Sequence, residues 1–125
     1  MATDGNARLV AIVDDDESVR SALQGLMRAA GLSAQSFANA EDFLTSGVMR
    51  QTACLIADIR MPGMSGLELQ DKLNAERLRI PIIFITAHGD AKMRLQAMRA
   101  GAVEFLAKPF DDEVLLDSIR AAMEV

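Results

Sequence analysis

An apolar stretch that ends on a single acid, residues 53–66 (ACLIADIRMPGMSG), most constrains how this chain folds. Five uncharged residues precede Asp58, which is typical of a strand buried on both faces. Because burial would desolvate a carboxylate, we expect Asp58 where the strand leaves the sheet. Gly63 and Gly66 then indicate a tight loop, and Ser65 is placed to cap the next helix. An Asp that merely ends its strand is the simpler interpretation, but this setting would also hold a reactive side chain.

Length and composition predict one domain spanning residues 1–125, with residues 1–7 as a loose N-terminus. Half of the residues are hydrophobic and all five aromatic residues are Phe, so the core must consist mainly of aliphatic side chains and Met. The single cysteine, Cys54, is interpreted as a core residue and excludes a disulfide framework.

Charge and hydropathy indicate the compartment and the class of partner. The formal net charge of −5 argues against nonspecific binding of nucleic acid, so a protein or a cation is the expected partner. No apolar run reaches transmembrane length, and the first residues do not resemble a signal peptide. We therefore expect a cytoplasmic protein that does not contact a membrane.

Strand-like and helix-like segments alternate five times along the chain. The further strands are predicted at residues 9–13, 33–37, 82–85 and 103–107, and the helices are predicted to begin after Asp16, Asn39, Ser65, Asp90, and Asp111 or Asp112. The inward faces of the last two helices are predicted to be Ala91, Leu95 and Met98, and Leu115, Ile119 and Ala122. This alternation predicts an α/β fold, a doubly wound five-stranded parallel sheet with five helices.

Polar side chains follow four of these strands. Asp14 and Asp15 follow the first, Asp58 ends the third, Thr86 follows the fourth and Lys108 follows the fifth. Right-handed crossovers place all these strand ends at one edge of the sheet. Each residue also has a plainer interpretation: a helix-capping acid cluster, an ordinary strand threonine, and a lysine that neutralises the acids.

Together these side chains predict phosphoryl chemistry. Carboxylates from two strand ends form a hard-oxygen pocket for Mg²⁺, and a hydroxyl and an ammonium opposite them would bind phosphoryl oxygens. Asp58 would be the nucleophile and would form an acyl phosphate. His88, the only histidine, is interpreted as an exposed loop residue.

With these motifs in place, the chain resembles the receiver domain of bacterial two-component response regulators from Arg8 to about Met123. The resemblance implies that Asp58 accepts phosphate from a sensor histidine kinase, in a self-catalysed reaction rather than enzymatic turnover. It also implies the strand order 2-1-3-4-5 and a cis peptide before Pro109. The implied site residues are Asp14, Asp15, Asp58 and the main-chain carbonyl of Arg60 for Mg²⁺, and Thr86, the Ala87 amide and Lys108 for the phosphoryl oxygens.

The resemblance further implies a switch formed by Thr86 and Phe105, where many relatives have Tyr in place of Phe. Phosphorylation would draw Thr86 inward, free space for Phe105 and remodel the face made by the fourth helix, the fifth strand and the last helix. We expect a homodimer favoured by phosphorylation. Its contacts would use Leu116 and Met123, predicted off the buried stripe of the last helix, and Lys92, Arg94 and Arg99 facing Asp112 or Asp117 of a second copy.

Four other functions fit the sequence less well. An aspartate-nucleophile phosphohydrolase of the haloacid dehalogenase type would use Asp14 and Asp16, but it gives Asp58 no role. An interaction module that is never phosphorylated would leave the full set of acceptor, metal and phosphate ligands unexplained. Dinucleotide binding lacks a glycine-rich turn, and zinc binding lacks Cys and His.

The sequence most resembles receivers attached to helix-turn-helix output domains. DNA would then be bound only through an output domain that this sequence does not include. The alternative is a regulator that consists of the receiver alone.

Overall fold

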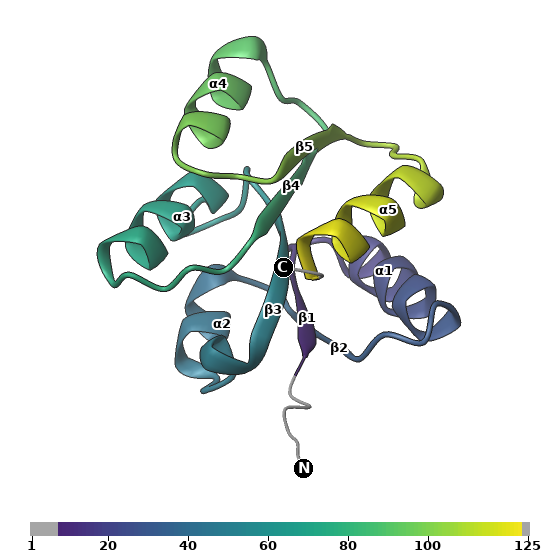
Figure 1. The fold of residues 1–125 in the computed structure, drawn as a ribbon. Helices are drawn as coiled ribbons and strands as arrows, with labels where there is room; N and C mark the ends of the chain where they lie inside the picture. Colours follow the sequence, from purple (N-terminus) through teal and green to yellow (C-terminus); the bar gives the residue numbers. More distant parts are fainter. Residues whose placement is uncertain (1–7, 124–125) are drawn as a thin grey trace.

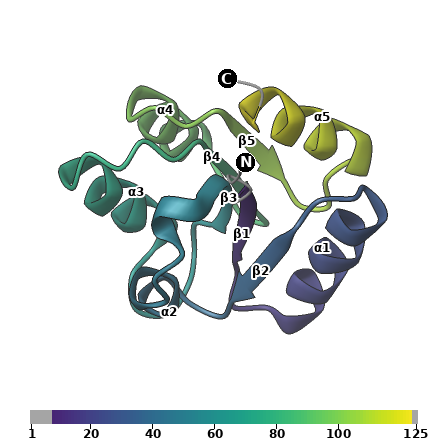
Figure 2. The same cartoon turned by 60° about the horizontal axis from the view of Figure 1, so that its bottom comes forward.

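The computed structural model describes residues 8–123 as a parallel sheet with helices on both faces (Figure 1 and Figure 2). The strands lie in the order β2-β1-β3-β4-β5, and every neighbouring pair is parallel. The strands are β1 (Leu9–Val13), β2 (Ala34–Phe37), β3 (Thr52–Asp58), β4 (Ile82–Thr86) and β5 (Glu104–Ala107). The helices are α1 (Glu17–Ala29), α2 (Ala40–Thr45), α3 (Gly66–Ala75), α4 (Ala91–Arg99), α5 (Asp112–Met123) and the short 3-10 helix η2 (Met49–Gln51). The predicted fold and strand order are confirmed, while the predicted loose N-terminus lies outside the described residues.

Side-chain caps set where the helices begin. The Asp16 carboxylate accepts hydrogen bonds from the backbone of Ser18 and Val19 at the start of α1. The predicted caps at the other helices are confirmed as Asn39, Ser65, Asp90 and Asp111. Each strand therefore ends in a short loop that is held by a cap, and the loop residues at the carboxyl edge of the sheet have defined positions.

One face of the sheet is covered by α1 and α5 (Figure 1). Leu23 and Met27 of α1 and Leu115 of α5 pack there against alternate residues of β1, β3 and β4. Cys54 belongs to this core, and burial raises the pKa of its thiol to about 12. The prediction that Cys54 is a core residue is confirmed.

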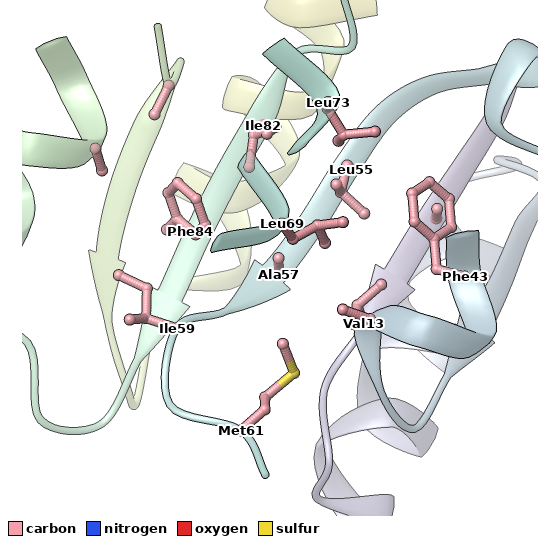
Figure 3. Close-up of a cluster of buried hydrophobic side chains, with 14 of the residues drawn as sticks. Val13, Phe43, Leu55, Ala57, Ile59, Met61, Leu69, Leu73, Ile82 and Phe84 are labelled. Atoms are coloured by element: carbon pink, nitrogen blue, oxygen red, sulfur yellow. The ribbon is translucent and has the colours of Figure 1, made fainter. Parts of the chain in front are cut away.

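The other face is covered by α2, α3 and α4 (Figure 1). Phe43, Leu69 and Phe84 are fully buried in its core, and Figure 3 shows them around the apolar residues of β3. Met61 reaches the same cluster from the loop after β3, so the loop that follows Asp58 is tied to the core (Figure 3).

The predicted inward face of α4 is wrong for Ala91 and Leu95. Leu95 is 52% exposed and Ala91 is also exposed, whereas Ala97 is fully buried and Met98 is half-buried. The face that packs against the core instead carries Ala97 with Met93 and Met98, and the buried Gln70 side chain of α3 donates a hydrogen bond to the carbonyl of Ala97 at 3.0 Å. The spacing of the larger apolar residues does not reveal this face, because its fully buried residue is an alanine, which carries a weak apolar signal.

The last helix also differs in part from its prediction. Leu115, Ile119 and Ala122 are buried as predicted, but Leu116 is only 8% exposed and belongs to the core. The buried face of α5 is wider than predicted. It includes Leu116, because Leu116 lies one helical turn before the buried Ile119. Leu116 is therefore not exposed for the predicted dimer contact. Met123, the other residue predicted there, is half-buried against the same core.

Strand bounds differ from the predicted ones by one residue, since β2 begins at Ala34, β5 begins at Glu104 and β4 extends to Thr86. The peptide between Lys108 and Pro109 is cis, as the family resemblance implied. None of the helices within residues 8–123 is long and apolar enough to cross a membrane.

Candidate functional site

The parallel register brings the predicted residues to the carboxyl edge of the sheet. Val13 pairs with Ala57, so Asp14 and Asp58 follow on adjacent strands, and Asp58 in turn pairs with Ile85, the residue before Thr86. Thr86 pairs with Ala107, the residue before Lys108. Four side chains that are far apart in sequence are thereby placed at one edge.

Three carboxylates gather at this edge. Oxygens of Asp14, Asp15 and Asp58 all lie within 4.8 Å of one another. Asp14 is fully buried and Asp58 is 6% exposed, while Asp15 is exposed. Three like charges this close repel one another, so the cluster favours a cation or a proton.

Lys108 supplies part of the positive charge that balances the three carboxylates. Its Nζ donates to Asp14 Oδ2 and to Asp58 Oδ2, each at 2.9 Å. Burial alone would lower the pKa of Lys108, but the hydrogen bonds to Asp58 and Asp14 raise it overall, which keeps the ammonium charged. This geometry is the predicted counter-ion arrangement.

The negative charge of the Asp14 carboxylate remains unfavourable despite the contact with Lys108. Burial raises the pKa of its carboxyl, and the nearby charge of Asp58 raises it further. Hydrogen bonds from the Asp16 backbone N–H and from Lys108 lower the pKa only in part. The sequence predicted the cluster but not Arg20, whose guanidinium donates to the Asp14 carbonyl at 2.8 Å.

The loop after β3 is fitted closely to Asp58. The backbone N–H of Arg60 donates to Asp58 Oδ1 at 3.3 Å, so the Arg60 backbone lies beside the carboxylate. Gly66 N–H donates to the Ile59 carbonyl at 2.9 Å, and a Cβ on Gly66 would overlap the Asp58 carbonyl oxygen. A capping box between Ser65 and Glu68 fixes the end of the loop at α3.

Thr86 carries a hydroxyl that is buried and has no hydrogen-bond partner among the described residues. The residue is 1% exposed, so its oxygen is also withheld from bulk water. An unpaired buried hydroxyl is unfavourable, which makes this atom a candidate ligand for a group that enters the site. Ala87 and His88 follow in an exposed loop, as predicted for His88.

Phe105 and Thr86 both lie against Gly89, which was not among the predicted site residues. A Cβ on Gly89 would lie 2.6 Å from the Thr86 methyl and 2.7 Å from the Phe105 ring. The two predicted switch residues therefore contact the same loop residue, and Phe105 is 9% exposed. A glycine in an exposed loop carried no signal of this contact, because the sequence does not show how closely β4 and β5 approach it.

Comparison with known proteins identifies the class that this fold and site define. The sequence model of the response regulator receiver domain matches residues 10–120, so the chain belongs to that family. Nothing in the comparisons supports the phosphohydrolase alternative.

Individual proteins agree with this assignment. The chain is 47% identical over 116 residues to nodulation protein W of Bradyrhizobium diazoefficiens, covering 93% of the chain and 51% of that protein. It superposes on the response regulator StyR with a TM-score of 0.87 at 50% identity, covering 94% of the chain and 59% of StyR. It superposes on FixJ-N with a TM-score of 0.85 at 41% identity, covering 98% and 96% of the two chains. The chain spans about half the length of the curated relatives that it matches.

Proposed function

We propose that residues 1–125 form one phosphoacceptor receiver domain in which Asp58 takes the phosphoryl group. The observation that carries this proposal is the setting of the Asp58 carboxylate, held by Lys108 Nζ at 2.9 Å and by the Arg60 backbone N–H at 3.3 Å. An Asp58 oxygen attacks the phosphorus of a phosphohistidine on a sensor histidine kinase. The new O–P bond forms as the P–N bond breaks, and the imidazole nitrogen leaves with the electron pair.

The donor set around Asp58 fits Mg²⁺. Oxygens of Asp14, Asp15 and Asp58 lie within 4.8 Å of one another, and their charge exceeds that of Lys108. Carboxylate and carbonyl oxygens are the ligands that this ion prefers, and we propose that these three residues and the Arg60 main-chain carbonyl hold it. When bound, Mg²⁺ neutralises the charge on the phosphoryl oxygens.

Three other residues are proposed to bind the phosphoryl oxygens. The Thr86 hydroxyl, which has no partner within residues 8–123, would donate to one oxygen, and the Ala87 amide and the Lys108 ammonium would donate to others. Lys108 can do so because its Nζ already lies at 2.9 Å from Asp58 Oδ2. As Thr86 moves toward the phosphoryl group, its methyl leaves Gly89 and Phe105 can move into the space.

The switched face is proposed to favour a homodimer. The surface of α4 carries the exposed Leu95 in a hollow that Lys92 and Arg99 also line. In a second copy, Asp112 and Asp117 of α5 are exposed and would meet these cations. Arg94 also donates to the Phe105 carbonyl at 3.2 Å, which joins this surface to the switch.

Partners beyond this domain are inferred from the relatives. Several are named as response regulators or transcriptional regulatory proteins. We infer that the chain acts in the cytoplasm with a sensor histidine kinase, and that DNA is reached only through an output domain that this sequence does not include.

The test is the intact mass after incubation with acetyl phosphate and Mg²⁺. We expect one added phosphoryl group on the wild type, and none on Asp58→Asn or after chelation of the metal. A label that survives in Asp58→Asn but is lost in Asp14→Asn would overturn the assignment in favour of a hydrolase-type nucleophile. No label on the wild type would refute phosphoacceptance altogether.

A further inference from the structure

One hydrogen bond joins α2 to the loop that follows Asp58. Glu41 Oε2 accepts it from the backbone N–H of Met64 at 3.1 Å, across 23 positions of the sequence. The same carboxylate lies over Gly63, where a Cβ would be 3.0 Å from Glu41 Oε2. Glu41 therefore contacts two successive residues of the loop.

This contact is the polar restraint on a part of the loop that is otherwise held by the packing of Met61 and Met64 against the core. The start of the loop is held by the bond from Arg60 N–H to Asp58, and its end by the bond from Gly66 N–H to the Ile59 carbonyl. Within the described chain, Glu41 is the one side chain from outside residues 52–66 that hydrogen-bonds residues 60–64. The tip of the loop therefore has a single polar link to another element.

The local backbone is shaped for this link. Gly63 has φ of 78°, in the left-handed region that favours glycine, and the chain turns there just before the Met64 N–H. Glu41 is exposed, so its carboxylate keeps most of its hydration while it accepts the bond. Such a bond adds little to global stability, and its main effect is on the geometry of the loop.

We propose that Glu41 is a positioning residue for the magnesium-dependent reaction, because it holds the loop that carries the Arg60 carbonyl. The inference rests on the proposed role of Asp58 and its metal ligands. Arg60 lies three residues before Gly63, and the packing of Met61 fixes the side chain next to it, so a loose tip would act on the Arg60 carbonyl by letting the peptide rotate about this anchor. We expect Glu41→Ala to weaken Mg²⁺ binding by about three- to tenfold, less than the ~10–100-fold typical of groups bound directly to a metal ligand.

Three variants separate positioning from charge. Glu41→Ala removes the acceptor, whereas Glu41→Gln keeps an oxygen that can accept from the Met64 N–H. Asp42→Ala removes an acid from the same helix, and within the described residues the Asp42 carboxylate accepts a hydrogen bond only from the Asn39 amide, at 3.3 Å. The capping hydrogen bond of Asn39 comes from the Asp42 backbone N–H, which this control keeps.

The measurements are amide hydrogen exchange at Met64 without metal, Mg²⁺ affinity by NMR titration, and initial phosphorylation rates with acetyl phosphate. In Glu41→Ala we expect faster Met64 exchange, weaker Mg²⁺ binding, and a phosphorylation rate that recovers to within about twofold at saturating Mg²⁺. Glu41→Gln and Asp42→Ala should match the wild type in all three.

Two results would overturn the role of Glu41. One is wild-type Mg²⁺ affinity in Glu41→Ala, and the other is an equal loss of affinity in Asp42→Ala, which would indicate a general charge effect. A wild type that binds Mg²⁺ but takes no phosphoryl group would instead refute the proposed function, and the titration would still decide whether Glu41 positions the loop.

Discussion

Replacing Asp14 by Asn is expected to stabilise the metal-free protein. Asp14 is fully buried beside Asp58, and burial is the main reason that the pKa of its carboxyl is raised. An acid whose pKa is higher in the folded state is destabilising when ionised, because folding then opposes its charge. Asparagine keeps the shape and one acceptor oxygen without the charge.

The magnitude follows from the balance of contacts. The Lys108 contact at 2.9 Å offsets part of the cost of burying the Asp14 charge, so removing that charge gains less than it would for an unpaired buried carboxylate. We therefore expect Asp14→Asn to raise the free energy of unfolding at pH 7 by ~0.5–2 kcal/mol, the range typical of a single stabilising substitution. Below the ordinary carboxyl value of 3.8, Asp14 is protonated in both states and the penalty vanishes. As the pH rises through the folded-state pKa the penalty becomes complete, so the difference between the two proteins narrows on acidification.

The assay is urea unfolding followed by far-UV circular dichroism in EDTA, because the chain has neither Trp nor Tyr for fluorescence. Added Mg²⁺ should stabilise the wild type by about 1.4 kcal/mol at ten times its dissociation constant, and Asp14→Asn by less. A variant less stable than the wild type at pH 7, or a difference that widens as the pH falls, would refute the reasoning.

Three further predictions concern residues around this cluster. Thr86→Val keeps the methyl against Gly89 but removes the unpaired hydroxyl, so the free energy of unfolding should rise by ~1 kcal/mol; a clear loss in urea unfolding would contradict this. Gly66→Ala should lower the free energy of unfolding by ~2 kcal/mol, because a Cβ would overlap the Asp58 carbonyl oxygen. An unchanged melting temperature would count against that contact. Cys54, with its pKa raised to about 12, should resist a thiol reagent at pH 8 until the protein is denatured; rapid labelling of the native protein would be inconsistent with its burial.

The strand ends were predictable because their signal is local. A run of apolar residues followed by an acid or a lysine shows both the buried strand and its exit, and parallel topology then brings the exits together. The bonds from Lys108 to Asp14 and Asp58 follow from that topology, although the three residues are far apart in sequence.

The contacts that refine the site were not predictable in this way. Gly89 against Phe105 and Glu41 against Met64 each join two elements whose spacing is set by packing, not by a pattern along the chain. Part of the face of α4 was predicted incorrectly because the fully buried residue there is Ala97, whose carbonyl accepts a hydrogen bond from Gln70 of α3. Apolar periodicity predicts which hydrophobic residues are buried, but it does not predict hydrogen bonds between helices.

The most direct test of the central assignment locates the phosphoryl group on the wild-type chain. After phosphorylation with acetyl phosphate and Mg²⁺, borohydride reduces an aspartyl phosphate to homoserine, and peptide mass spectrometry identifies the altered residue. We predict a single altered position, Asp58, that disappears when the metal is chelated. Alteration at Asp14 or at any other residue, with Asp58 unmodified, would contradict the account.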